Sequence, residues 1–183
     1  MEIVDEPTEG LKIIHLDRFN DVRGSFTEGW NKEEFARKGL DIDFYQDNYV
    51  HSRSDVIRGL HYQTTPHEQG KLITCLQGTI LDVAVDLRPR SNTFGKHFTL
   101  TLSEYNNFAF WIPAGFAHGY GVLSDKSIVS YKCDALWNPK HEAGYHWDSP
   151  ELGIDWGIKE PIISYKDMAL PVFERATAEE EWV

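Results

Sequence analysis

Alternating apolar and polar residues dominate the chain from residue 44 onward, and this period of two is typical of β-strands with one buried face. The segment Thr79–Leu87 is the clearest example, because its odd positions from Leu81 to Leu87 are apolar while Asp82 and Asp86 lie on the other face. The same pattern, divided by turn residues, predicts strands at Phe44–Val50, Val56–His61, Lys71–Gln77, Thr79–Leu87, His97–Leu102, Asn107–Ile112, Ala117–Leu123 and Ile128–Asp134.

The connections between these segments are short, which favours antiparallel neighbours. Gly78 alone separates Lys71–Gln77 from Thr79–Leu87, and Pro89 ends the second of these strands where no ladder donor is needed. We therefore expect antiparallel hairpins within an all-β fold, an antiparallel jelly-roll or cupin-type barrel with a few short peripheral helices.

Little helix is predicted. Lys32–Lys38 is the best short helix, with acidic residues near its start and Gly39 stopping it. Leu11–Leu16 is predicted as the first strand. The tail from Tyr145 to Val183 is rich in turn residues, and we expect it to form short helices that cover the barrel.

Composition narrows the class of protein. The 183 residues suit a single domain, 1–183, and 41% apolar residues argue against disorder. A formal net charge of −11 disfavours a nucleic-acid partner. Two cysteines, Cys75 and Cys133, make no disulfide framework, so we expect buried free thiols.

The N-terminal segment MEIVDEPTEG is acidic and lacks the basic and apolar regions of a signal peptide, and no apolar run approaches the length of a membrane span. We therefore expect a cytoplasmic protein with no membrane partner.

Two histidine motifs bear on a metal site. Pro113-x-Gly-x-x-His118 matches half of the signature of metal-binding cupins. The other half needs a His-x-His pair, and here the corresponding stretch is His61-Tyr62-Gln63, which supplies one imidazole where two are required. The sequence therefore predicts no metal ligand set.

Nine motifs together resemble the dTDP-4-dehydrorhamnose 3,5-epimerase family, a nucleotide-sugar branch of the cupins, and the resemblance runs from about Leu16 to Phe173. The motifs are F-N-D-V-R-G-S-F at 19–26, Q-D-N at 46–48, I-R-G-L-H-Y-Q at 57–63, Q-G-K-L at 69–72, D-V-A-V-D-L-R at 82–88, W-I-P-A-G-F-A-H-G at 111–119, Y-K-C at 131–133, W-D-S-P-E-L-G-I at 147–154 and S-Y-K-D at 164–167.

The resemblance implies an isomerase that inverts C3 and C5 of a dTDP-4-keto-6-deoxy-hexose without a cofactor, a step in dTDP-rhamnose and polysaccharide biosynthesis. It implies that His61 is the catalytic base, paired with Asp167, that Lys71 lies beside the ketone oxygen, and that Tyr131 is the acid on the opposite face of the ring. Substrate-binding residues implied in the same way are Arg23, Glu28, Gln46, Asn48, Arg58, His118, Trp137 and Lys166.

Elementary chemistry supports this division of roles. Both carbons lie beside the same ketone, so each inversion needs a C–H proton removed from one side and another delivered from the far side. Such a C–H is a far weaker acid than imidazolium, so the enolate must be stabilised, and a preorganised donor such as Lys71 typically contributes about 3–4 kcal/mol.

The sequence departs from the family at one place, where Leu136 and Trp137 replace a pair of tyrosines. Trp137 keeps an aromatic surface for the nucleotide and loses a hydroxyl. Relatives that invert a single carbon in antibiotic or surface-polysaccharide pathways share nearly all these motifs, so the sequence does not decide between single and double epimerisation, the nucleotide base or the final sugar.

Two functions of other classes remain open: a metal-dependent cupin oxygenase or isomerase, and a non-catalytic cupin that binds sugar nucleotides. Because the family is dimeric and open sheets expose edges, we also expect a homodimer in which an N-terminal strand such as Leu11–Leu16 adds to the partner's sheet.

Overall fold

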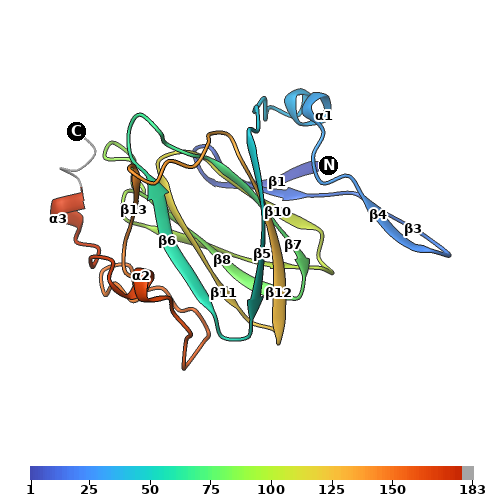
Figure 1. Cartoon of the computed structure of the whole chain (residues 1–183). Coiled ribbons are helices and arrows are strands. Elements are labelled where there is room, and N and C mark those ends of the chain that lie inside the picture. Colours follow the sequence, from blue (N-terminus) through green and yellow to red (C-terminus); the bar gives the residue numbers. More distant parts are fainter. Residues whose placement is uncertain (179–183) are drawn as a thin grey trace.

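The computed structural model describes residues 1–178 and consists mainly of two antiparallel sheets packed face to face around a shared core (Figure 1). Its strands are β1 (Glu2–Thr8), β2 (Leu11–His15), β3 (Arg18–Asp21), β4 (Gly24–Thr27), β5 (Gln46–Arg53), β6 (Ile57–Gln63), β7 (Lys71–Gln77), β8 (Thr79–Asp86), β9 (His97–Ser103), β10 (Phe108–Ile112), β11 (Phe116–Val122), β12 (Lys126–Cys133) and β13 (Glu142–Gly144). The six-stranded sheet has the order β1-β2-β10-β7-β12-β5, and the five-stranded sheet has the order β13-β6-β11-β8-β9. The predicted all-β jelly roll is confirmed.

Successive strands often belong to different sheets. β5, β7, β10 and β12 lie in the six-stranded sheet, whereas β6, β8 and β11 lie in the five-stranded one. The expected hairpin of β7 with β8 is therefore wrong: Gly78 carries the chain from one sheet to the other. Its φ is +81°, and a Cβ there would lie 2.1 Å from the Lys126 carbonyl oxygen, so the corner requires glycine.

Three N-terminal strands were not predicted, and one prediction fails because of them. β1 has no buried residue and forms the edge of the six-stranded sheet, while β3 and β4 pair as a separate two-stranded arm that extends away from the body (Figure 1). Leu11–His15 is an interior strand, hydrogen-bonded to β1 on one side and β10 on the other. It has no free edge to offer a partner's sheet, so Leu11–Leu16 was the wrong strand to name, and the N-terminal strand at the edge is β1.

The helices are short. α1 (Lys32–Arg37) begins at the Asn31 cap, whose side chain accepts the N–H groups of Glu33 and Glu34, so the predicted helix is confirmed to within a residue. In the tail, α2 (Tyr165–Met168) and α3 (Arg175–Ala178) are separated by turns and loops. Within residues 1–178, no helix has the length and apolar character needed to cross a membrane.

Both faces of β8 are buried, because the C-terminal tail covers the face that points away from the six-stranded sheet. Val83, Val85 and Leu87 pack outward against Trp156 and Phe173 of the C-terminal segment, which lies over the five-stranded sheet. The opposite face, which includes Ile80 and Ala84, packs inward against the six-stranded sheet. The prediction that the tail covers the barrel is confirmed up to residue 178, and residues 179–183 of that tail lie outside the described part of the chain.

Candidate active site

A cavity between the two sheets collects most of the predicted site residues. It has a larger lobe of about 520 Å³ and a smaller lobe of about 320 Å³. Both lobes are lined by the same four residues, His61, Lys71, Tyr131 and Glu142, so we treat them as parts of one cavity. A single bound molecule could therefore touch both lobes.

His61 forms one wall of the cavity from β6 and is paired with a carboxylate. Its Nε2 lies 2.8 Å from Oδ1 of Asp167, which is buried at the first turn of α2. Burial works to raise the pKa of Asp167, but hydrogen bonds from His61 and the Gly59 N–H outweigh it and hold that pKa below its usual value. Because the carboxylate accepts the proton on Nε2, the neutral ring has its basic lone pair on Nδ1.

Lys71 and Tyr131 form the opposite wall, from β7 and β12 of the other sheet. Burial raises the pKa of the Tyr131 phenol to about 12, so the group stays protonated at neutral pH. Burial also lowers the pKa of the Lys71 amine, and the negative groups around it oppose that shift. A base on one wall, and a proton donor with an amine on the other, can serve the two faces of a flat reacting group between them.

His118 supplies a second imidazole beside the first. It lies directly opposite His61 in the register of β11 and β6, and it lines the smaller lobe. Its Nε2 lies 2.6 Å from Oδ1 of Asp82, whose side chain is fully buried. Burial lowers the pKa of His118 and raises that of Asp82, so the neutral imidazole is the form we assign.

The predicted substrate-binding residues divide between the lobes. Gln46, Asn48 and Trp137 line the larger lobe, where the Trp137 backbone N–H donates to Gln46 Oε1 at 2.8 Å. Arg58, His118 and Lys166 line the smaller lobe. The cavity thus combines an aromatic and amide-rich end with an end that carries two cations.

Arg23 and Glu28 do not join this cavity within one chain. Arg23 lies at the tip of the β3–β4 arm, where its side chain is 86% exposed and forms an ion pair with Asp21 at 2.5 Å. Glu28 follows the arm and lines a separate surface hollow with Met1 and Asn31.

Glu142 is a cavity residue that the sequence did not reveal. Its carboxylate accepts from Lys166 at 2.7 Å and from the Trp137 indole N–H at 3.2 Å, and it lines both lobes. It belongs to the three-residue strand β13, which has no alternation to mark it. Its pairing with Lys166 is visible only in three dimensions.

Neither the two cysteines nor any metal-ligand cluster adds a reactive group to the interior of residues 1–178. Cys75 and Cys133 are buried free thiols, as expected, and burial raises the pKa of each to about 11. Thiols held protonated in this way are poor nucleophiles. Among residues 1–178, no group of three or more His, Cys, Asp or Glu side chains is arranged to hold a metal ion.

Known proteins share both the sequence and this architecture. The sequence model of the family described as dTDP-4-dehydrorhamnose 3,5-epimerase matches residues 5–175. A dTDP-4-dehydrorhamnose 3,5-epimerase from Methanothermobacter thermautotrophicus is 45% identical over 162 residues, which is 87% of each chain. The dTDP-6-deoxy-D-glucose-3,5-epimerase of Legionella pneumophila, solved with dTDP-4-keto-L-rhamnose, matches with a TM-score of 0.89 and 40% identity over 93% of this chain and 92% of that one.

A second kind of enzyme is also similar. A 3'-monoepimerase from Streptomyces bikiniensis, solved with dTDP-quinovose, matches with a TM-score of 0.87 and 32% identity over 98% of this chain and 90% of that one. The match to the family model over nearly the whole chain, together with relatives above 40% identity, identifies the chain as a member of the dTDP-4-dehydrorhamnose 3,5-epimerase family.

Proposed function

We propose that this protein is an isomerase that inverts C3 and C5 of a dTDP-4-keto-6-deoxy-hexose. The observation that carries the proposal is that His61 and Tyr131 come from opposite sheets and line one cavity together with Lys71. Inversion at carbon requires this arrangement, because the incoming proton must approach from the side opposite the departing one. Family membership supplies the substrate class.

Inversion at each carbon takes two proton transfers, one on each face of the sugar ring. Nδ1 of His61 takes the proton from a carbon beside the ketone, and the C–H electron pair moves toward the carbonyl oxygen to give an enolate. The Lys71 ammonium stabilises that oxygen. The Tyr131 phenol then donates its proton to the other face of the carbon, after which solvent restores the phenol and removes the proton from the imidazolium.

The charges of the cavity suit a nucleoside diphosphate. With a net charge of −11, the protein as a whole repels anions, so local cations must bind the diphosphate. We assign this role to Arg58 and Lys166 in the smaller lobe, and we assign contact with the nucleoside to Trp137, Gln46 and Asn48 in the larger lobe. No metal or other cofactor is part of the proposal.

We also propose a homodimer in which the β3–β4 arm completes a neighbouring site. Phe19 and Phe26 on the arm are 63% and 65% exposed, which is unusual for large apolar side chains unless a partner covers them. The family resemblance assigns Arg23 and Glu28 to the substrate, and the arm directs them away from their own cavity. Arg23 of the partner subunit would then serve this cavity.

The dimer has a direct test. Light scattering should give about twice the 21.1 kDa chain mass. Mixing His61→Ala with Arg23→Ala subunits should restore activity, because one hybrid site then has both intact residues; no recovery after subunit exchange would count against a shared site. We further propose that the enzyme works in the cytoplasm, where nucleotide sugars are made.

Deuterium exchange tests the activity itself. Incubation with dTDP-4-keto-6-deoxy-glucose in deuterated water should place label at C3 and C5, as followed by NMR, and His61→Ala should abolish exchange at both carbons. Absence of label at either carbon with the wild-type protein would overturn the proposal. The similarity to a 3'-monoepimerase makes single inversion the second candidate, and label confined to C3 would establish it.

A further inference from the structure

β8 carries two fully buried carboxylates on one face. Asp82 and Asp86 have no exposed surface, and because side chains in a strand alternate, residues four apart point the same way. An ionised carboxylate away from water is costly unless donors or cations compensate it. Asp82 and Asp86 differ in the donors that surround their carboxylates.

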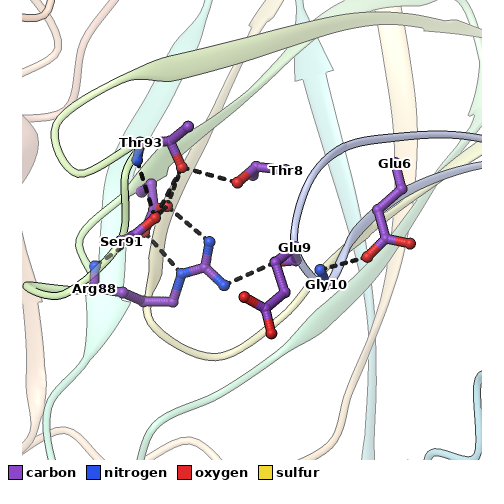
Figure 2. A network of polar contacts seen from close by, with 8 residues as sticks. Glu6, Thr8, Glu9, Gly10, Arg88, Ser91 and Thr93 are labelled. Carbon is purple, nitrogen blue, oxygen red and sulfur yellow. Dashed lines mark hydrogen bonds and ion pairs between the residues drawn. The ribbon is translucent and has the colours of Figure 1, made fainter.

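Asp86 is saturated with donors. Its carboxylate accepts from the guanidinium of Arg88 at 2.9 and 2.7 Å and from the hydroxyls of Ser91 and Thr93, each at 2.6 Å. Figure 2 shows Arg88, Ser91 and Thr93 gathered in one polar network, with Thr8 beside Thr93 and the Arg88 side chain directed toward Glu9, whose carbonyl accepts from it at 2.7 Å. These contacts fasten the loop after β8 to the β1–β2 turn, which gives Asp86 a complete structural explanation.

Asp82 has no comparable set of donors. Oδ1 accepts from His118 Nε2 at 2.6 Å, whereas the buried Oδ2 has no hydrogen-bond partner among the residues that the structure describes. A carboxylate kept for structure alone would be expected to have its second oxygen paired, as that of Asp86 is. Asp82 lies behind His118, which lines the smaller lobe together with Lys71, and this placement suggests what compensates its charge.

We propose that Asp82 is a positioning residue of the epimerase site, whose carboxylate fixes His118 through Nε2 and provides the countercharge that keeps the buried Lys71 amine cationic. The inference rests on the proposed function, because a cationic Lys71 matters only if an enolate forms beside it. Fixing Nε2 as the donor also leaves Nδ1 of His118 as an acceptor for a substrate hydroxyl.

The other acidic groups near Lys71 are either already paired or uncharged at neutral pH. Cys133, Asp82, Glu142 and Asp134 each act to raise the pKa of Lys71 against the effect of burial. Glu142 is paired with Lys166 at 2.7 Å, Asp134 accepts the Gly70 N–H at 2.6 Å, and the Cys133 thiol stays protonated at neutral pH.

That leaves Asp82 as the countercharge with no cation of its own. Its other neighbours with titratable groups are His118, whose pKa burial lowers, the phenol of Tyr120, whose pKa burial raises, and the Cys75 thiol, whose pKa burial raises to about 11. The Coulombic effect is mutual, since Lys71 acts to lower the pKa of Asp82. In this proposal one carboxylate behind the cavity wall and one ammonium in that wall balance each other.

Asp82→Asn tests the charge with little change of shape, because the amide oxygen can still accept from His118. Losing the countercharge lowers the pKa of Lys71 further, so activity should be lost from the alkaline side. We expect the alkaline limb of the pH profile of kcat for deuterium exchange to shift to lower pH by about one unit. At a given pH on that limb the rate is then about tenfold lower, whereas KM should change less than about twofold.

Asp86→Asn is the matched control, being the same substitution on the same face of the same strand. It should lower stability and leave the position of the alkaline limb unchanged. If Asp82→Asn keeps the wild-type limb, whether or not its rate falls, the proposed countercharge is overturned. Wild-type exchange is the reference: its absence would count against the proposed function, whereas wild-type exchange with an unmoved limb would count against this inference alone.

A measurement on the wild-type protein covers the case in which Asp82→Asn does not fold. With 15N-lysine label, and Lys71→Arg used to assign the signal, Lys71 Nζ should resonate as an ammonium at pH 7. A neutral amine at that pH would overturn the proposal.

Discussion

His61 and Asp167 are 106 residues apart in the sequence and share a 2.8 Å hydrogen bond. The contact depends on two elements that have little else in common, the long strand β6 and the four-residue helix α2. Ser164 caps α2 by accepting the Asp167 N–H at 3.0 Å, so the carboxylate is held by its own backbone before it meets the imidazole. The barrel thus supplies His61, and the C-terminal tail supplies the carboxylate that pairs with it.

Replacing Asp167 with asparagine should weaken His61 as a base without weakening substrate binding. An amide can donate to Nε2 and so stabilise the wrong tautomer, with the proton on Nδ1. We expect kcat for deuterium exchange to fall about 10²- to 10⁴-fold, the usual contribution of a general base, with KM nearly unchanged. Asp148→Asn, at an exposed carboxylate of the same tail, is the control and should behave as wild type. Equal loss in both variants would mean that the tail, and not the pairing, is responsible.

Tyr131→Phe should separate exchange from inversion. His61 can still remove and return a proton on its own side, so label should continue to enter while net inversion falls about 10²-fold. NMR of the product mixture gives both quantities at once. Inversion at the wild-type rate would remove Tyr131 from the proposed acid role.

The titration of Tyr131 gives a second, independent check. Burial raises its pKa to about 12 from the ordinary value of about 10, so the folded state holds this proton more tightly than the unfolded chain. The resulting stability is complete below pH 10 and is lost as pH rises from about 10 to about 12. The difference in tyrosinate absorbance between wild type and Tyr131→Phe should be absent below pH 10. A step at lower pH would show a more accessible phenol.

The barrel strands could be predicted because burial on one face imposes alternation. β7 was predicted with both ends correct, and β8 and β12 to within one or two residues. The pairing of the strands could not be predicted, because the side-chain pattern across Gly78 is the same for a hairpin as for a corner between sheets. The arm was missed because β3 and β4 are largely exposed, so their sequences show no alternation between buried apolar and exposed polar residues.

The site shows a similar division. His61, Lys71 and Tyr131 stand in sequence motifs and were assigned by resemblance, and the cavity brings all three together. Glu142 was missed because its role depends on Lys166 and Trp137, which reach it through folding. Asp82 and Asp86 looked alike in the alternation of β8, since only the surrounding donors distinguish them. Such differences belong to tertiary contacts and leave no local pattern.

Trp137 should contribute to binding and not to the chemical step. Its ring is exposed at the larger lobe and available for stacking, while its indole N–H is held by Glu142 at 3.2 Å. Trp137→Ala should raise KM about 10- to 100-fold with kcat unchanged, since stacking on an aromatic ring is worth about 1–3 kcal/mol per base. Trp137→Phe keeps a ring and should lose less. Calorimetric titration with dTDP measures the same loss without catalysis, and equal affinity in all three proteins would exclude stacking.

Asp86→Asn should destabilise the fold in a way that depends on pH. Burial works to raise the pKa of Asp86, but hydrogen bonds from Arg88, Ser91 and Thr93 prevail and lower it. The unfolded chain therefore binds this proton at a higher pH than the folded one, so the stabilisation is present above the unfolded pKa and is lost as pH falls through the folded value.

At pH 7 the substitution leaves Arg88 beside a neutral amide, and we expect a loss of about 3 kcal/mol in the free energy of unfolding by urea. The gap between wild type and variant should narrow below about pH 4, where wild-type Asp86 begins to be protonated in the unfolded chain. Asp125→Asn, at an exposed carboxylate, should show neither effect. A gap that stays constant down to pH 3 would mean that the loss comes from altered packing, because only an interaction with the ionised carboxylate can disappear when that carboxylate is protonated.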